Sequence, residues 1–504
     1  ADGRIHATQG YRKHAIFSLW DTFRAAHPLF TLIDPDRVTD FVHSMLSFHE
    51  EQGLLPVWSL VGNETNTMTG NHALPVIADA YRKGFRSFDA EGALAAMVKS
   101  ATQDQRGLEQ YRLFRYVPTG LEDESVTKTL EYAFNDWAIA SMALDLGVED
   151  VYEHFIVRSS WWRHLLDPET HFMRGKTVDG EWAEPFDPRR SDHREGTDYT
   201  EGNAWQHTWF VPHDVRGLIH GMGGEKVFLA KLDSLFEMDS VITGESPSAD
   251  ISGLIGQYAH GNEPSHHIAY LYNWTSQPWK TADRVREILD TQYDDTPFGL
   301  SGNEDCGQMT AWYVLSALGL YPVNPANGIW VLGSPVFPEA TLEVGAGRTF
   351  TIRAQGVSGE ARYVQSARLN GKPLDRTFLR HREIADGGVL VLEMGPEPST
   401  WGTSRDARPP SQSDGRLDRM EDRGPVDEPG VAGPSSPAHG RGMASSSASP
   451  REMAERVKAE FRHAWQGYLT HARGMDALKP LSRSGRNWYG VSLVMTPLDA
   501  YDEY

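Results

Sequence analysis

The sequence has a single cysteine and no long apolar segment. Because Cys306 stands alone among 504 residues, no disulfide can form within the chain, and the redox compartment stays undetermined. No run of about 18 apolar residues occurs, so we expect no membrane-spanning helix. The first residues, Ala1 to Arg4, contain neither Met nor the apolar start of a leader, so we expect a processed or excised chain.

Positive charge is also scarce. The chain has 48 Lys and Arg residues against 69 Asp and Glu residues, which gives a formal net charge of −21. A duplex nucleic acid partner requires clustered basic side chains, so this balance argues against one. Instead, a hydrophobic content of 39% with 11% aromatic residues indicates a globular chain with a large core, and its length favours two or more domains.

Residues 1–322 show the periodicity of helices. Val38, Val42 and Met45 form one apolar stripe that ends before Gly53. Similar stripes predict helices within 74–81, 93–99, 126–146, 151–166, 215–220, 226–236, 265–274, 283–293 and 308–318. About ten helices with almost no strand pattern predict an all-α domain, closed into a ring or stacked as a solenoid. We find no fixed-period repeat that favours the solenoid.

The pattern changes after Pro322. Short β-rich segments separated by glycine-containing turns predict a small β region over residues 323–402. Residues 403–450 are rich in Ser, Pro, Gly, Asp and Arg, which predicts a disordered linker. Residues 451–504 regain helical character and predict the truncated start of a second domain.

Three loops combine an acid, an Asn and a Gly at the start of a predicted helix. They carry Glu201 with Asn203, Glu263 with Asn262, and the pair Glu304 and Asp305 with Asn303. Each acid could simply cap a helix or a turn, but three such loops beside Trp or His favour chemistry. Two carboxyl groups flanking a sugar are the minimum machinery of glycoside hydrolysis, since one protonates the leaving oxygen and the other activates water or attacks. Their separation, which decides between inversion and retention, cannot be read from the sequence.

Other polar groups have simpler interpretations beside the functional ones. The loop 62–72 is dense in side-chain oxygens, which suits sugar hydroxyls, a hard cation such as calcium, or an Asx-rich turn bonding its own backbone. Histidines 260, 266 and 267 favour hydrogen bonds to hydroxyls over a transition metal, and no zinc motif occurs. Cys306 has no partner His specified by spacing, which argues against a nucleophile. Several of the 15 tryptophans, including Trp20, flank polar motifs and offer faces for a pyranose ring or for the core.

Five segments together resemble glycoside hydrolase family 92, the calcium-dependent exo-α-mannosidases, in order and content over residues 11–401. They read SLWDTFRAAHPL, LPVWSLVGNETNTMTGNHALPVIADAY, YTEGNAWQHTWFVPHD, GLIGQYAHGNEPSHHIAYLYNW and GLSGNEDCGQMTAWYVLSALGLYPVNP. The resemblance implies an (α/α)6 barrel and an inverting mechanism, with Glu201 as general acid and Asp305 as general base. Asn303 occupies a position where family members often carry an Asp that assists the base, so here it can orient water without sharing the role of the base.

The same resemblance implies a calcium ion that binds the mannose 2- and 3-hydroxyls, with Asn262 and Glu263 as its ligands. An exchange of roles between Glu201 and Glu263 stays open at this point. The residues expected to contact substrate are Trp20, Asp21, Glu64, His72, His260 and His266.

Two departures from the family bear on activity. The family has a β-sandwich domain before the barrel that helps to form the pocket, and nothing in these residues supplies it. Residues 457–502 resemble the opening helices of a glycoside hydrolase family 47 α-mannosidase, whose catalytic acids would follow Tyr504.

The leading hypothesis is therefore an exo-α-mannosidase that removes terminal mannose from N-glycans or mannans, in a periplasmic or extracellular location. One alternative is an inactive mannose-binding remnant whose pocket lacks a wall. Another is a different α/α-barrel carbohydrate enzyme, such as a phosphorylase or lyase. Linkage preference and oligomeric state are not decided by the sequence.

Overall fold

The structure is a computed structural model that describes residues 8, 10–60, 62–193, 196–415, 450–473, 477–479 and 483–486. The chain forms two compact units. The larger unit comprises the described residues of Ala1–Lys13, Phe17–Ser59 and Glu64–Pro429, and the smaller one those of His14–Ile16, Leu60–Asn63 and Gly430–Tyr504. Among the described helices, none combines the length and apolarity needed to cross a membrane.

Helices of the larger unit alternate between deeply buried and half-exposed along the chain. The buried set comprises α2 (Ala26–Ile33), α4 (Ala73–Arg82), α7 (Ser125–Leu146), α10 (Val215–Gly221), the 3-10 helix η3 (Ile268–Trp274) and α13 (Gln308–Leu318). Half-exposed partners follow them, namely α3 (Pro35–Gln52), α5 (Ala90–Ala101), α8 (Glu149–Arg158), α11 (Glu225–Glu237) and α12 (Trp279–Gln292). Because α13 contacts both α12 and α2, the last helix pair returns to the first and the ring closes. This confirms the predicted (α/α)6 barrel and excludes the solenoid.

Sequence pattern explains why α7 lies inside the ring. Its first 20 residues are all buried, from Ser125 to Leu144, including polar residues such as Glu131 and Asn135. A helix that is buried on all sides lies in a core, where each of its polar groups needs a partner. The helix ends at Gly147, whose φ of +78° suits glycine and whose N–H caps the last turn.

Shorter helices complete the loops that carry the polar motifs. They are α1 (Leu19–Thr22), α6 (Leu108–Phe114), α9 (Ala204–His207), and the 3-10 helices η1 (Trp161–His164) and η2 (Glu263–Ser265). The predicted helix 265–274 is 3-10 rather than α over most of its length, as η3. Helices α2 and α6 were not predicted, because Pro28 and a short exposed segment obscure their periodicity.

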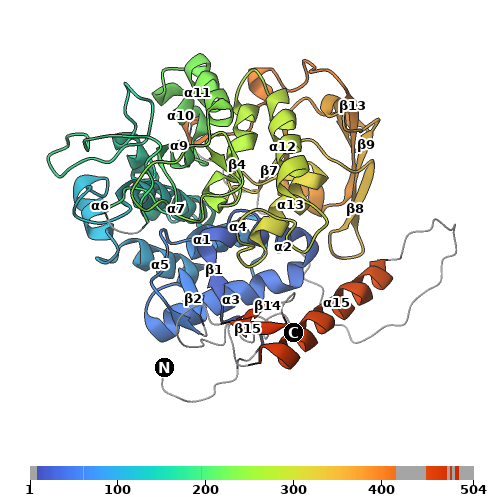
Figure 1. Cartoon of the computed structure of the whole chain (residues 1–504), viewed down its shortest axis with the longest axis horizontal. Coiled ribbons are helices and arrows are strands. Elements are labelled where there is room, and N and C mark those ends of the chain that lie inside the picture. The colour runs from blue at the N-terminus through green and yellow to red at the C-terminus, as the bar shows by residue number, and fades with distance from the viewer. Residues whose placement is uncertain are drawn as a thin grey trace. The chain divides into compact units, whose positions relative to one another are not determined.

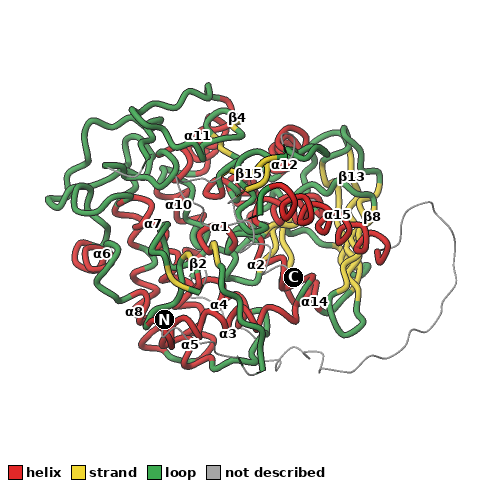
Figure 2. The backbone as a smooth tube through the Cα atoms, turned by 60° about the horizontal axis from the view of Figure 1, so that its bottom comes forward, coloured by secondary structure: helices red, strands yellow, loops and turns green. Residues whose placement is uncertain are grey.

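The predicted β region forms two sheets after the last barrel helix. One has the order β11 (Lys372–Pro373), β10 (Tyr363–Leu369), β13 (Gly388–Gly395), β9 (Thr349–Gln355) and β8 (Glu339–Glu343). All its pairs are antiparallel except β13 with β9. The other has the order β12 (Phe378–Arg380), β7 (Ile329–Leu332) and β6 (Leu320–Tyr321). The five-stranded sheet lies on the side of this unit opposite α6 in both views (Figures 1 and 2). Since both sheets belong to the same compact unit as the barrel, a domain boundary at residue 322 stays a prediction.

The predicted disordered linker starts too early in the sequence. Residues 403–415 include the 3-10 helices η4 (Arg405–Ala407) and η5 (Gln412–Asp414). Ser411 Oγ accepts a hydrogen bond from Arg216 N at 3.1 Å, and Ser413 N donates to Asp214 Oδ1 at 3.0 Å. Specific polar contacts with the start of α10 therefore hold this segment, although its composition resembles a linker. Residues 416–449 lie outside the described residues.

The smaller unit contains the helix predicted at the start of residues 451–504. It is α15 (Pro450–His471), which contacts the paired strands β14 (Ala477–Lys479) and β15 (Ser484–Arg486). Trp465 and Tyr468 both belong to this helix, and their rings stack on each other with centroids 5.4 Å apart. The remaining residues expected to resemble a family 47 mannosidase lie outside the described residues.

Candidate active site

Glu201 lies on the loop directly before α9. Asn203 caps this helix, since its Oδ1 accepts from Trp205 N at 2.9 Å and Gln206 Oε1 accepts from Asn203 N at 2.8 Å. Asn203, and not the acid Glu201, therefore caps this helix. Glu201 itself has a φ of +46°, a left-handed conformation that is uncommon for a residue with a side chain and that persists only where the surroundings hold it.

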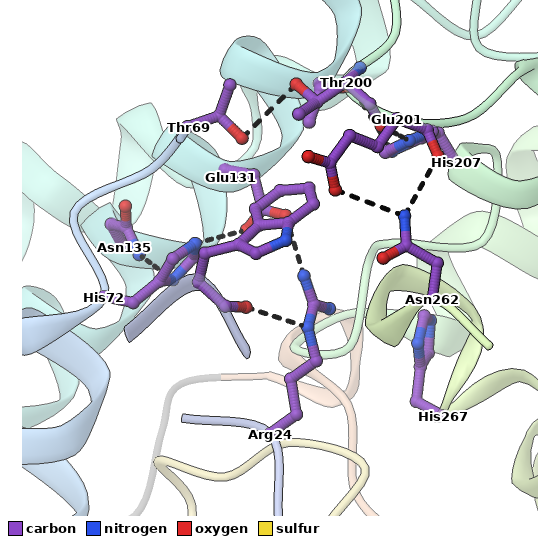
Figure 3. A network of polar contacts seen from close by, with 12 residues as sticks. Arg24, Thr69, His72, Glu131, Asn135, Thr200, Glu201, His207, Asn262 and His267 are labelled. Atoms are coloured by element: carbon purple, nitrogen blue, oxygen red, sulfur yellow. Dashed lines mark hydrogen bonds and ion pairs between the residues drawn. The ribbon is translucent and has the colours of Figure 1, made fainter. Parts of the chain in front are cut away.

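Hydrogen bonds to Thr200 hold that conformation from several directions (Figure 3). Thr200 N donates to Thr127 Oγ1 at 3.0 Å, and Thr200 O accepts from His207 Nε2 at 2.8 Å. The other ring nitrogen of His207 lies 3.2 Å from Thr127 Oγ1. Burial lowers the pKa of His207 to about 4, so the ring is neutral near pH 7 and one nitrogen donates while the other accepts.

Asn262 joins the loop of Glu263 to Glu201. Its Nδ2 donates to Glu201 O at 3.0 Å and to Glu201 Oε2 at 3.4 Å, as Figure 3 shows. Burial, then the nearby carboxylate of Asp250, raises the pKa of Glu201 to about 8, although the Asn262 bond works in the opposite direction. Glu201 is therefore protonated near neutral pH and has a proton to donate. The amide oxygen of Asn262 is left to accept or to coordinate.

Asp305 lies in the turn that precedes α13. Both Asp305 and Cys306 have positive φ angles, of 51° and 56°, so the backbone conformation is unusual at the predicted general base. Glu304 accepts from Thr310 N at 3.1 Å and from Gly307 N, and thereby caps the helix. Burial, followed by the charge of Asp250, raises the pKa of Asp305 to about 6.

Asp21, Glu263 and Asp305 come together from three distant segments. One carboxylate oxygen of each lies within 4.8 Å of the others. Burial raises the pKa of Asp21 and that of Glu263 well above their usual range, and the neighbouring carboxylates add to the effect. Neither oxygen of Glu263 has a hydrogen-bond partner among the residues that the structure describes. Since buried carboxylate oxygens need a donor, a proton or a cation, this acidic triad fits a divalent cation with oxygen ligands.

A buried arginine near the triad does not neutralise it. Arg24 donates from Nη2 to Glu131 Oε1 at 3.3 Å and from Nε to Trp20 O at 3.1 Å. Its guanidinium also packs on the rings of Trp20 and Phe210, at 5.2 Å and 5.0 Å from their centroids. Figure 3 shows Arg24 facing Glu131 from below. Arg24 is thus paired with Glu131, and its charge only partly offsets the burial and the mutual repulsion that raise the pKa values of Asp21 and Glu263.

Two of the other predicted contact residues, Glu64 and His72, are engaged by the protein. Glu64 accepts from the backbone N–H groups of Val57, Trp58, Thr65 and Asn66, as the Asx-rich turn interpretation requires. His72 Nε2 lies 3.0 Å from Glu131 Oε2 and its ring stacks on Phe23 with centroids 4.0 Å apart. Trp20 is buried, and its ring N–H has no hydrogen-bond partner among the described residues.

The other two histidines predicted to contact substrate, His260 and His266, have both ring nitrogens occupied. His260 lies 2.9 Å from Tyr258 Oη at Nδ1 and 2.7 Å from Tyr293 Oη at Nε2. His266 lies 3.0 Å from Gln308 Nε2 at Nδ1 and 3.1 Å from His260 O at Nε2. These rings brace the loop of Glu263 against α13 and leave no ring nitrogen to a ligand.

Two glycines bring the loop of Glu263 and the turn of Asp305 into backbone contact. A Cβ on Gly302 would lie 2.1 Å from Gly261 O, and a Cβ on Gly261 would lie 3.1 Å from Gly302 N. Such distances exclude any side chain without movement of the backbone. The glycine pair therefore sets how closely Glu263 approaches Asp305.

We expect Gly302→Ala to reduce turnover by about a hundredfold, because displacing a catalytic group by about 1 Å is sufficient for such a loss. Gly307→Ala is the matched control, since Gly307 also has a positive φ, of +91°, but a Cβ there meets nothing within 4 Å. Steady-state rates and thermal unfolding of both variants show whether activity is lost through displacement of the Gly261 backbone or through strain at a positive φ angle. Equal losses of activity in the two variants would contradict this account.

The fold and the site together define a class of protein. A closed ring of paired helices, with buried carboxyl groups gathered from several loops and at least one of them protonated, is the arrangement of an α/α-barrel glycoside hydrolase. The sequence matches the glycosyl hydrolase family 92 catalytic domain over residues 1–396, and the chain belongs to this family. The predicted resemblance is confirmed.

Solved and curated relatives agree with this assignment. A family 92 α-mannosidase from Bacteroides thetaiotaomicron in complex with mannoimidazole is 41% identical, with a TM-score of 0.78 over 82% of this chain and 55% of that one. A family 92 inverting mannosidase of the same species is 36% identical, with a TM-score of 0.71 over 79% of this chain and 55% of the other. An uncharacterized secreted glycosidase from Arthroderma benhamiae is 29% identical over 413 residues, 74% of this chain and 51% of its own length. The chain thus spans about half the length of these relatives.

The predicted second resemblance has support over a short stretch only. A mannosyl-oligosaccharide α-1,2-mannosidase from Coccidioides posadasii is 49% identical over 53 residues, which is 10% of this chain and 10% of that enzyme.

Proposed function

We propose that this chain carries the catalytic machinery of an exo-acting α-mannosidase, which hydrolyses terminal α-linked mannose of N-glycans or mannans with inversion. The observation that carries the proposal is a pair of acids on separate loops: Glu201, which accepts from Asn262, and Asp305, which belongs to the acidic triad. Two family 92 relatives of known structure are named as an α-mannosidase and an inverting mannosidase. A secreted relative supports an extracellular or periplasmic location.

In the proposed reaction Glu201 is the general acid and Asp305 the general base. Glu201 donates its proton to the glycosidic oxygen as the bond from that oxygen to the anomeric carbon breaks. Asp305 accepts a proton from the water that attacks the opposite face of the sugar. We assign the acid to Glu201 rather than to Glu263 because Glu263 lies within the triad, whereas Glu201 lies outside it and accepts a hydrogen bond from Asn262.

Asp21 and Glu263, with the amide oxygen of Asn262, would hold the calcium ion. They fit calcium because every atom that they offer to the ion is an oxygen. In addition, the two oxygens of Glu263 lack other partners among the described residues. When bound, calcium supplies Lewis acidity and a template for the sugar hydroxyls. Trp20, whose ring N–H lacks a partner among the described residues, is proposed to contact the sugar. Glu64, His72, His260 and His266 are proposed to support the site rather than to touch substrate.

The test is hydrolysis of α-mannobiose by the whole protein as the organism makes it, beside calorimetry with the same sugar and calcium. Release of mannose supports the proposal. Binding without release would favour the mannose-binding alternative, which the half-length coverage of relatives motivates. A mannose phosphate or an unsaturated product, seen by NMR, would instead indicate a phosphorylase or a lyase.

The pKa values of the two proposed catalytic groups predict a pH optimum. Asp305 must have lost its proton, so kcat/KM falls as the pH drops below its pKa of about 6. Glu201 must retain its proton, so kcat/KM falls as the pH rises above its pKa of about 8. A pH profile of α-mannobiose hydrolysis checks both limbs. In Glu201→Gln the residual rate should lose the alkaline limb, and its persistence would assign that limb to another group.

A further inference from the structure

Asp250 lies beside the proposed base but was not identified from the sequence. It belongs to the loop between α11 and the short strand β4 (Leu254–Ile255). Its Oδ1 accepts from Asn303 Nδ2 at 3.4 Å, and its Oδ2 accepts from Ser248 Oγ at 2.9 Å. The carboxylate is therefore held by its own loop on one side and bonded to the turn of Asp305 on the other.

Backbone contacts fix the loop of Asp250 against the site. Gly261 N donates to Ser252 O at 3.0 Å, and His260 N donates to Gly253 O at 3.1 Å. A Cβ on Gly253 would lie 2.5 Å from Ser301 Oγ, so this loop also packs closely on the segment that leads into the turn. Asp250 thus keeps a defined position relative to both Glu263 and Asp305.

The charge of Asp250 reaches both proposed catalytic groups. After burial, it is the strongest influence raising the pKa of Glu201 and that of Asp305. Its direct hydrogen bond to Asn303 places Asp250 beside the turn that carries Asp305.

Asn303 can serve the attacking water only if its amide has one orientation. An amide has a donor end and an acceptor end. Because a carboxylate accepts and cannot donate, Asp250 selects the orientation in which Nδ2 of Asn303 faces it. The acceptor Oδ1 of Asn303 is then turned away from Asp250 and is left for another donor.

We propose that Asp250 is a positioning residue for hydrolysis, which holds Asn303 so that Asn303 Oδ1 accepts one hydrogen of the water whose other proton passes to Asp305. This inference rests on the proposed α-mannosidase function. The water oxygen forms the new bond to the anomeric carbon as the glycosidic bond breaks, Asp305 takes the proton of the water, and Glu201 protonates the leaving oxygen. Asp250 and Asn303 undergo no net change. Asp250 acts through Asn303 and needs no contact with substrate.

The test compares Asp250→Ala with Asp250→Asn in the whole protein. Two substrates are used, α-mannobiose and 2,4-dinitrophenyl α-mannoside, whose leaving group departs without an acid. Asp250→Ala should lower kcat by about ten- to a hundredfold on both substrates with KM within about twofold, since water positioning serves both. Asp250→Asn should stay within about threefold of wild type, because its amide oxygen still accepts from Asn303. Asp295→Asn, an exposed residue near the same turn, is the control for loss of one negative charge.

A double-mutant cycle tests the route through Asn303. In an Asn303→Ala background, Asp250→Ala should cost little more, because the residue through which it acts is gone. Additive losses in the double variant would overturn the proposal, as would equal losses in Asp250→Asn and Asp250→Ala. The proposal would also fail if Asp250→Ala lost activity on α-mannobiose alone, changed KM alone, or kept wild-type rates. Thermal unfolding of each variant checks folding. Wild-type protein that hydrolyses neither substrate would refute the proposed function itself, whereas active wild type with an unaffected Asp250→Ala refutes only this inference.

Discussion

Glu201→Gln is expected to lower kcat for α-mannobiose by about 10²- to 10⁴-fold, the usual contribution of a positioned general acid. Glutamine keeps the shape and can still accept the hydrogen bond from Asn262, which in the wild type has a length of 3.4 Å to Oε2. It has no proton to donate to the glycosidic oxygen. Steady-state kinetics on the disaccharide measures the loss directly.

A substrate whose leaving group needs no proton distinguishes loss of the general acid from a general disruption of the active site. With 2,4-dinitrophenyl α-mannoside, Glu201→Gln should retain a rate close to that of wild type, because this leaving group needs no proton. Glu360→Gln, an exposed residue of the β region, controls for the substitution itself. A variant equally impaired on both substrates would show that Glu201 is not the general acid.

The second large effect is expected at Asp305. Asp305→Ala should lower kcat by about 10²- to 10⁴-fold on both substrates, because the water then lacks its base. Azide should restore part of the rate on 2,4-dinitrophenyl α-mannoside, since an anion that needs no deprotonation can enter the space of the carboxylate. NMR of the product should show β-mannosyl azide, the isomer formed by attack from the face opposite the leaving group.

Asp305 also belongs to the acidic triad, so its role as base needs separation from a role in metal binding. Calorimetry with calcium provides this. If Asp305→Ala binds calcium nearly as tightly as wild type and azide rescues it, the carboxylate acts as base. Complete loss of calcium binding without azide rescue would make Asp305 a metal ligand and would require another base.

Local periodicity predicted the barrel helices because their apolar stripes are long. The stripe of Val38, Val42 and Met45 became α3, whose end at Gly53 was also predicted, and the segment after Val126 became α7. Ring closure through contacts of α13 with α2 depends on residues almost 300 positions apart, which periodicity cannot reveal. The choice between a ring and a solenoid therefore needed the structure.

The site was predictable from the sequence only in part. Glu201, Glu263 and Asp305 are visible because each shares a loop with Asn and Gly before a helix. The sequence cannot say that Glu263 and Asp305 share a triad with Asp21, or that His260 is held between Tyr258 and Tyr293.

Two further groups had no distinguishing pattern. Asp250 is an acid in a polar loop, and only its contact with Asn303 across 53 positions sets it apart. The partner of Arg24 is Glu131, 107 positions away in the sequence. Such pairings arise from tertiary packing, and because the groups are buried, removing one partner costs free energy of folding.

The central claim, calcium-dependent hydrolysis with inversion, is tested most directly by following α-mannobiose with the whole protein by proton NMR, with calcium and with EGTA. We expect β-mannose to appear first from the non-reducing sugar, before mutarotation, and hydrolysis to stop in EGTA and resume when calcium is restored. Initial release of α-mannose, or an undiminished rate in EGTA, would contradict the account.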